Sequence, residues 1–176
     1  MIGKKRNIKS LDQKAQRALF DQYNQKLISV AVRYVSSMDD AKDVLQESFI
    51  RIFKYMPKAD FKNRSMMEAW MVKITVNEAL RWLKKGKKHQ NEELIENVSG
   101  HMIVNGEDTH KQDLMRLIHT LPEGYKIVFN LYSIEGYSHK EIGELLKITE
   151  SASRSQLTRA RQLLQRKLNG QYERAK

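Results

Sequence analysis

The chain has 176 residues, a formal net charge of +11 and an isoelectric point near 9.8. This length suits one domain or two small ones, and the charge favours a polyanionic partner, nucleic acid first and an anionic membrane surface second. The lack of cysteine excludes disulfides and cysteine-ligated metal sites, and no apolar run approaches the roughly 20 residues that span a bilayer. The N-terminus, MIGKKRNIK, lacks the apolar core of a signal peptide, so we expect a cytoplasmic protein.

The spacing of apolar residues predicts an all-α fold of two small helical domains joined by a flexible linker. Apolar residues recur every three or four positions over long stretches, and only Pro57 and Pro122 interrupt the chain. Residues 1–10 are basic and lack apolar anchors, so we expect a frayed arm. The first domain, residues 11–85, begins with a long helix to about Val35 that is broken or bent.

A second helix is expected from Asp40 to Met56, after a turn with acidic capping residues. One face follows helical spacing and should pack in a core: Ala41, Val44, Leu45, Ser48, Phe49, Ile52, Phe53 and Met56. The opposite face has mixed charge: Asp43, Gln46, Glu47, Ile50, Arg51 and Lys54. Such a face is most simply a solvated surface, although an exposed Ile50 also suits a partner-binding surface.

The polar loop 58–65 follows Pro57 and contains one aromatic residue, Phe61. The aromatic ring offers a π face on which a base can stack, and the Lys, Arg, Asn and Ser side chains offer donors for the edges of the base, which suits single-stranded DNA. The alternative is a solvated loop with Phe61 in the core. The helix expected from about Met66 to Lys85 has a core stripe and a ladder of polar and basic residues: Lys73, Asn77, Arg81, Lys84 and Lys88. This ladder can follow a phosphate backbone while Asn77 bonds a base.

Residues 86–110 change in composition and predict a linker, because a compact domain rarely contains so long an irregular segment. The second domain, residues 111–176, opens with a short helix that Pro122 ends. A further helix follows, for which Gly136 is the expected C-cap.

The end of the chain predicts two helices joined by a tight turn. Ser138 and Glu141 form a capping box that begins the first helix, and Thr149 caps the second. The second helix has a packing stripe of Ser153, Leu157, Ala160, Leu164 and Leu168. Its other face has Ser151, Arg154, Ser155, Thr158, Arg159 and Gln162. This pattern matches a helix-turn-helix whose arginines can each bond two acceptors on guanine; a solvated basic helix is the alternative.

The run from Tyr137 to Arg161, with Arg154-Ser155 and Arg159-Ala160-Arg161, resembles the C-terminal DNA-binding domain of bacterial sigma factors of the extracytoplasmic-function (ECF) group. The upstream string DAKDVLQESF, residues 40–49, resembles the ECF segment that docks on the clamp helices of the RNA polymerase β′ subunit. The string WMVKITVNEA, residues 70–79, resembles the second promoter-contacting helix of these factors.

Three residues depart from the family pattern. Lys42 stands where an acidic residue is usual, and Gly143 replaces a usual alanine. Ser153 replaces a β-branched apolar residue, and its hydroxyl can bond back to the carbonyl of Thr149. We therefore expect a second domain that is less stable than average.

The resemblance implies three sets of contact residues, all named by their positions in this chain. Core polymerase contacts are expected at Asp43, Gln46, Glu47 and Arg51. Contacts with the melted −10 element are expected at Phe61, Lys62, Asn63, Arg64 and Ser65 of the loop, and at Lys73, Asn77, Arg81 and Lys84 of the following helix. Contacts with the −35 element are expected at Ser151, Arg154, Ser155, Thr158, Arg159 and Arg161.

The implied function is promoter recognition and DNA melting for transcription initiation by RNA polymerase core. The implied partners are the core enzyme, through the β′ clamp helices and the β flap, promoter DNA, and a membrane-bound or soluble anti-sigma protein. The rival reading is a stand-alone helix-turn-helix regulator, but the chain has no obvious dimerisation heptad for paired half-sites. A membrane-surface amphipathic protein is a third class.

No enzyme activity, cofactor or metal site is expected. His139-Lys140-Glu141 has the H-x-E spacing of zinc deaminases, but no cysteines follow it. The chain has no HExxH motif and no glycine-rich phosphate loop, and its other histidines are scattered. We therefore name no catalytic residue.

Overall fold

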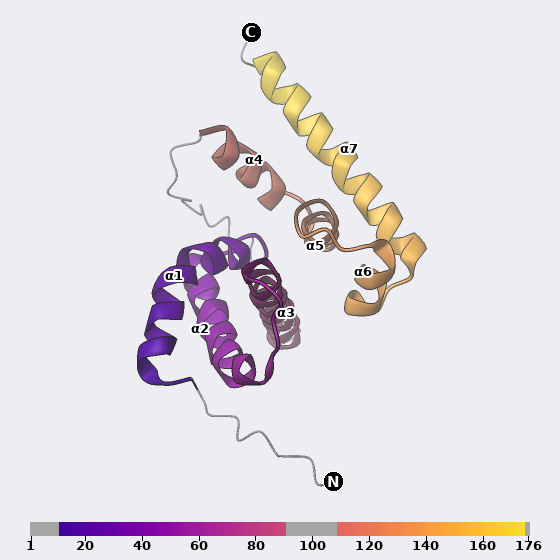
Figure 1. Ribbon diagram of the computed structural model, residues 1–176. Helices are drawn as coiled ribbons and strands as arrows, with labels where there is room; N and C mark the ends of the chain where they lie inside the picture. The colour runs from indigo at the N-terminus through magenta and orange to yellow at the C-terminus, as the bar shows by residue number, and fades with distance from the viewer. Residues whose placement is uncertain (1–10, 91–108, 175–176) are drawn as a thin grey trace. The chain divides into compact units, whose positions relative to one another are not determined.

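The computed structural model describes residues 11–90 and 109–174, and within them the chain is helical without strands (Figure 1). This confirms the predicted all-α class. The arm expected at residues 1–10 and most of the linker expected at 86–110 lie outside the described residues. Helices on either side of residues 91–108 form two separate compact units.

In the first unit, residues 11–90 form three packed α-helices. Its helices are α1 (Gln13–Ala31), α2 (Met38–Tyr55) and α3 (Arg64–Gln90), with a short 3₁₀ turn, η1 (Met56–Lys58), at Pro57. Each α-helix begins at a side chain that accepts from a backbone N–H three residues on, at Asp12, Ser37 and Asn63 respectively. The three caps satisfy donors that a helix start would otherwise leave unpaired.

The core of the first unit forms where α2 packs against both α1 and α3. It contains the buried residues Tyr23, Leu27, Leu45, Phe49, Ile52 and Met71. Two buried hydroxyls, of Ser48 and Thr75, donate to carbonyls one turn earlier at 2.6 and 3.1 Å, so neither is left unsatisfied. The predicted packing stripe of the second helix is therefore confirmed, including its serine.

Five helical elements lie in residues 109–174, the described part of the second unit. They are α4 (Thr109–His119), α5 (Glu123–Phe129), a π-helical turn η2 (Asn130–Ile134), α6 (His139–Leu146) and the long α7 (Glu150–Arg174). Helix α7 packs against α4, α5 and α6, and part of its core consists of Leu117, Ile118, Leu121, Ala160 and Leu164. Gly136 has φ +77°, the left-handed conformation predicted after the preceding helix.

The tight turn between α6 and α7 has two features that were not predicted from the sequence. Lys147 adopts φ 57°, a left-handed conformation more usual for glycine. A Cβ atom at Gly143 would lie 2.8 Å from the carbonyl oxygen of Ile148, so the turn comes too close to α6 for any side chain there. The close approach of the Ile148 carbonyl oxygen therefore explains why position 143 has glycine and not the usual alanine.

Two expectations about local structure were wrong, and one possible contact is replaced by another. Helix α3 begins at Arg64, before the expected Met66, and continues to Gln90, so the first linker residues are helical. Leu168 was expected to pack, but its exposed fraction is 37%. The sequence allowed a bond from the Ser153 hydroxyl to the Thr149 carbonyl. In the structure its Oγ lies 2.9 Å from Nδ1 of His139 instead, because the histidine from α6 reaches the buried face of α7.

Candidate nucleic-acid and partner-binding surfaces

The outer face of α2 is the first candidate surface. Asp43, Gln46 and Glu47 are exposed on it, as the sequence predicted. Arg51 differs, because its Nε lies 2.5 Å from Oε1 of the buried Glu78 on α3. Its side chain is 36% exposed, so part of it can reach a partner although it is paired with that carboxylate.

An apolar groove of about 410 Å³ lies beside these polar residues. Its lining includes Phe20 of α1 and Leu45, Phe49, Ile50 and Phe53 of α2, with Lys42 and Gln46 at its polar side. Phe20 is 39% and Ile50 is 53% exposed, and the Phe20 and Phe49 rings lie 4.8 Å apart. The sequence pointed to Ile50 alone, because Phe20 belongs to a different helix and reaches the groove only in the folded unit.

The segment before α3 holds the aromatic residue that was expected to meet a flipped base. Phe61 is partly buried, and its ring centroid lies 5.2 Å from that of Trp70. Asn63 accepts a 2.9 Å hydrogen bond from the Met66 N–H as the cap of α3, while Lys62 is exposed. The ring therefore packs on one side, and the amide nitrogen of Asn63 is the group that its capping bond leaves available.

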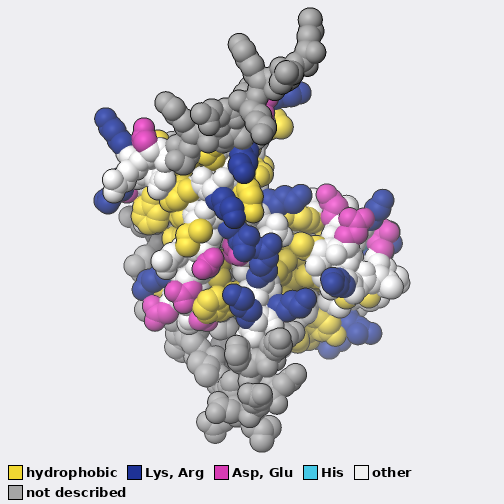
Figure 2. Space-filling model, turned by 90° about the horizontal axis from the view of Figure 1, so that it is seen from below, with side chains coloured by type: hydrophobic (Ala, Val, Ile, Leu, Met, Phe, Trp, Pro, Cys, Tyr) yellow, Lys and Arg dark blue, Asp and Glu magenta, His cyan; other side chains and the backbone are white. Residues whose placement is uncertain are grey.

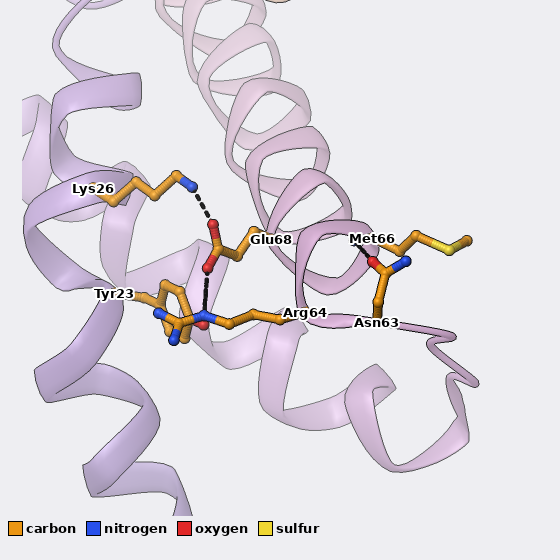
Figure 3. Close-up of polar contacts among 6 residues, drawn as sticks. All are labelled: Tyr23, Lys26, Asn63, Arg64, Met66 and Glu68. Carbon is orange, nitrogen blue, oxygen red and sulfur yellow. Dashed lines mark hydrogen bonds and ion pairs between the residues drawn. The ribbon is translucent and has the colours of Figure 1, made fainter.

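Arg64 and Ser65 lie in the first turn of α3 and not in the loop where they were expected. Figure 3 shows Arg64 beside Glu68, with Tyr23 and Lys26 reaching the same carboxylate from α1. Glu68 accepts from Lys26 Nζ at 2.5 Å, from Arg64 Nε at 2.8 Å and from the Tyr23 hydroxyl at 3.2 Å. Hydrogen bonds from Lys26 and Arg64 lower the pKa of Glu68 to about 2, so this carboxylate is ionised at neutral pH.

The cationic ladder on α3 comprises Lys73, Asn77, Arg81 and Lys84. Lys73, Arg81 and Lys84 are exposed and Asn77 is half-buried, and their spacing places them along about 16 Å of helix. Arg81 also donates from Nη1 to Glu78 at 2.6 Å, so Glu78 binds both Arg51 and Arg81. The side chain of Lys88, the last member expected, lies outside the described residues.

On the face shown in Figure 2, basic side chains lie among hydrophobic ones. Within the described residues, no three potential metal ligands among His, Cys, Asp and Glu come together. Every helix in residues 11–90 and 109–174 is too short or too polar to cross a membrane.

The helix-turn-helix of the second unit begins and turns as the sequence predicted. Ser138 and Glu141 form the reciprocal capping box, with the Ser138 N–H donating to Glu141 at 2.9 Å. Thr149 caps α7 by accepting from the Ala152 N–H at 3.0 Å. These caps fix where α6 and α7 begin and so fix which residues of α7 face outward.

The outward face of α7, called the reading face below, consists of Ser151, Arg154, Ser155, Thr158, Arg159 and Arg161, all exposed. The arginines of this face make weak contacts within the unit. Arg154 pairs with the exposed Glu150 one turn earlier, and Arg159 donates to the Tyr125 hydroxyl at 3.4 Å. Arg161 lies over the Tyr132 ring at 5.8 Å.

His139 joins α6 to the buried face of α7, and the sequence analysis missed it. Its ring stacks on Tyr132 at 4.4 Å between centroids, while Nδ1 meets the Ser153 hydroxyl. Burial and the nearby Arg154 lower its pKa below the usual 6.5, and Glu150 opposes them. No local motif could reveal this contact, because the partners are separated in sequence and come together only in the folded helix-turn-helix.

Comparison with known proteins adds independent findings. The family model described as Sigma-70 region 2 matches residues 19–89, and the one described as Sigma-70, region 4 matches residues 111–164. The chain is 30% identical over 171 residues to the ECF RNA polymerase sigma-E factor of Haemophilus influenzae, covering 89% of each chain. It is 28% identical to the protein of that name in Escherichia coli K12, covering 89% of this chain and 88% of the other.

A solved structure shares the fold. The sigma factor RpoE of Bartonella quintana, determined in complex with the anti-sigma factor NepR, matches with a TM-score of 0.59 and 20% sequence identity. The match covers 87% of this chain and 96% of that one.

Proposed function

This chain belongs to the ECF group of sigma-70 factors, and from that premise we propose that it binds RNA polymerase core and directs it to promoters, where it helps to melt the DNA. The observation that supports this most is the pairing, in one chain, of a capped helix-turn-helix with a second helical unit that exposes both a polar α2 face and a cationic ladder. A regulator that binds its operator without polymerase would need only the helix-turn-helix.

The reading face is proposed to bind the −35 duplex. A major groove admits one α-helix, and Arg154 or Arg159 can bond two acceptors on a guanine. Both guanidinium groups are exposed, and their partners within the unit are weak competitors: a surface carboxylate one turn away and a hydroxyl at 3.4 Å. Base acceptors can therefore replace these contacts at low cost.

The loop and first turn at residues 61–65, with the cationic ladder, are proposed to hold melted −10 DNA. Single-stranded DNA binds where cations follow its backbone and ring faces accept its bases. Lys62, Lys73 and Lys84 are exposed and have no carboxylate partner among the described interactions. Asn77, half-buried within the ladder, is the candidate for a base contact.

The polar face of α2 and the groove beside it are proposed to bind core polymerase. Asp43 and Glu47 supply negative charge in an otherwise basic chain, and Phe20 and Ile50 supply apolar surface that a monomer gains nothing by exposing. A partner that covers both needs an apolar ridge flanked by basic groups. An anti-sigma protein is proposed as a further partner. The proposal places the protein in the cytoplasm, at the nucleoid when it is bound to polymerase.

Core-dependent transcription on a randomised promoter library tests the proposal. The expected result is that purified chain plus bacterial core polymerase enriches promoters with two conserved elements at fixed spacing, and that neither component alone does so. The contrary result is tight binding of the chain alone to a palindromic duplex with no binding to core, which would favour the stand-alone regulator.

A further inference from the structure

The guanidinium group of Arg64 is held by neighbouring side chains beside the loop that is proposed to bind melted DNA. Arg64 lies in the first turn of α3, next to the loop residues Lys62 and Asn63, and its side chain is 66% exposed. Its inner nitrogen, Nε, donates to Glu68 at 2.8 Å, and its guanidinium carbon lies 5.7 Å from the centroid of the Tyr23 ring (Figure 3). The guanidinium is thus fixed along one edge and against one face.

This arrangement leaves the outer edge of the guanidinium available. An arginine has five N–H donors. The bond to Glu68 uses the one on Nε, and the Tyr23 hydroxyl also interacts with the guanidinium. The N–H groups that point away from both residues can still contact oxygen acceptors. A fixed guanidinium loses less conformational freedom when it binds a ligand than a free one does. Two cations, Lys26 and Arg64, face a single carboxylate, so the cluster keeps one positive charge.

We propose that Glu68 is a positioning residue for promoter melting: it orients Arg64 so that the outer edge of the guanidinium binds oxygen acceptors of the melted −10 strand. This inference rests on the proposed function. Glu68 itself touches no DNA, because its carboxylate accepts from three protein donors, and its side chain is only 22% exposed.

A purely structural role for Glu68 makes a different prediction. Lys26 and Tyr23 both belong to α1, so the same carboxylate also ties α1 to α3. Loss of that tie would lower stability without changing how the surviving folded molecules bind DNA. A purely electrostatic role differs again, because removing a negative charge beside a DNA-binding surface should raise affinity.

A double-mutant cycle on Glu68 and Arg64 separates these accounts. Holoenzyme is assembled from core polymerase and the full chain as wild type, Glu68→Ala, Arg64→Ala or the double variant. The probe is a labelled non-template −10 oligonucleotide from a promoter recovered from the randomised library. We expect Glu68→Ala to weaken binding about fivefold although it adds positive charge, and to have no effect in the Arg64→Ala background.

Two further variants control for folding. Glu68→Gln keeps an acceptor oxygen for Arg64 and should bind the oligonucleotide between wild type and Glu68→Ala. Lys26→Met removes one of the two contacts that join α1 to Glu68 and leaves the hydrogen bonds of Glu68 with Tyr23 and Arg64. It should therefore lower the melting temperature and leave oligonucleotide affinity within about twofold. Circular dichroism of every variant shows whether each one is folded.

The inference is overturned if Glu68→Ala raises affinity, leaves it unchanged, or weakens it equally with and without Arg64. It is also overturned if Arg64→Ala alone has no effect. In those cases Lys73→Ala and Asn77→Ala decide the wider question: if they still weaken binding, the −10 surface stands and only the role of Glu68 is wrong. If they too have no effect, the proposed function of the first unit fails.

Discussion

The two units hold their exposed arginines in different ways. In the first unit, Arg51 and Arg81 share the buried carboxylate of Glu78, and Arg64 is bound by Glu68, each of these carboxylates lying on α3. The carboxylates of Glu78 and Glu68 are 7% and 22% exposed, whereas Arg154 of the second unit pairs with Glu150, which is 45% exposed. The first arrangement orders side chains before a ligand arrives, whereas the second leaves them free to adapt.

This difference fits the two forms of DNA that the units are proposed to bind. A melted strand is flexible, so a protein that orders its own side chains in advance reduces the total ordering cost of the complex. Duplex DNA is already rigid and presents base edges at fixed positions, so arginines that can still adjust can find them. The predictions below test this contrast, from the largest expected effect to the smallest.

Removing the shared carboxylate should have the largest effect on stability. Glu78→Ala leaves Arg51 and Arg81 without their partner at a buried site, and we expect a loss of about 2–3 kcal/mol in the free energy of unfolding. Glu150→Ala, the matched change on α7, should cost less than about 0.5 kcal/mol. Both tryptophans, Trp70 and Trp82, lie on α3, so denaturation followed by tryptophan fluorescence reports the first unit, and circular dichroism reports both. Equal losses from the two substitutions would remove the contrast.

Adding a methyl group at Gly143, next to the turn of the helix-turn-helix, should destabilise the second unit. Gly143→Ala places a Cβ 2.8 Å from the Ile148 carbonyl oxygen, and we expect a loss of about 1–3 kcal/mol in the stability of the second unit. Gly124→Ala is the control, because its Cβ would meet only the end of the Gln156 side chain at 3.4 Å. Circular dichroism should show a lower melting temperature for the first variant while the tryptophan transition is unchanged; a Gly143→Ala protein as stable as wild type would show that the turn can relax.

Arginines of the reading face should affect sequence preference, and ladder lysines should not. Arg154→Ala or Arg159→Ala should cost about 1–3 kcal/mol in promoter binding and relax preference at one base pair. Lys84→Ala should weaken binding on all sequences by a smaller amount and reduce its salt dependence. Holoenzyme binding to a panel of −35 variants at several salt concentrations measures both. Uniform losses from all three variants would mean that the arginines contact only phosphates.

Mild acid should weaken the second unit before the first. The pKa of His139 is lowered in the folded chain, so its contribution to stability is complete above 6.5, the usual value, and declines as the pH falls below it. The pKa of Glu68 is about 2 against a usual 4.5, so its contribution is complete above 4.5 and is lost between 4.5 and 2.

Thermal unfolding at pH 7 and pH 5 tests this small effect. The circular dichroism transition that tryptophan fluorescence does not follow belongs to the second unit, and its melting temperature should be lower at pH 5. His139→Asn, which keeps a polar group for Ser153, should reduce that pH dependence. The tryptophan signal of the first unit should change less over the same range. Parallel losses in both signals would show that His139 is not the group responsible.

Local patterns in the sequence were enough to predict the helices and their caps. Three of these features depend on residues within a few consecutive helical turns, and all three are confirmed. They are the capping box at Ser138 and Glu141, the cap at Thr149 and the buried stripe of α2. The family resemblance then identified two regions that the family models also match. The contact residues inferred from it remain predictions.

Contacts between distant residues could not be predicted. Glu78 was part of the string at residues 70–79 and was given no role of its own, yet it is buried and binds Arg51 from α2. Glu68 drew no attention, because its partners Tyr23 and Lys26 are on another helix. His139 was considered only as part of an H-x-E spacing, and its partner Ser153 was assigned a different bond. Such pairs depend on how the helices pack, which spacing along one helix does not determine.

Site-specific crosslinking in the assembled promoter complex tests the central claim most directly. With a photo-crosslinking amino acid at Asn77 or at Ser155 in otherwise intact holoenzyme, the account predicts that Asn77 reacts with melted −10 DNA and Ser155 with the upstream −35 duplex, in both cases only when core polymerase is present. Crosslinks at Asn77 that never map to melted DNA, or crosslinks at both positions that are unchanged without core, would contradict it.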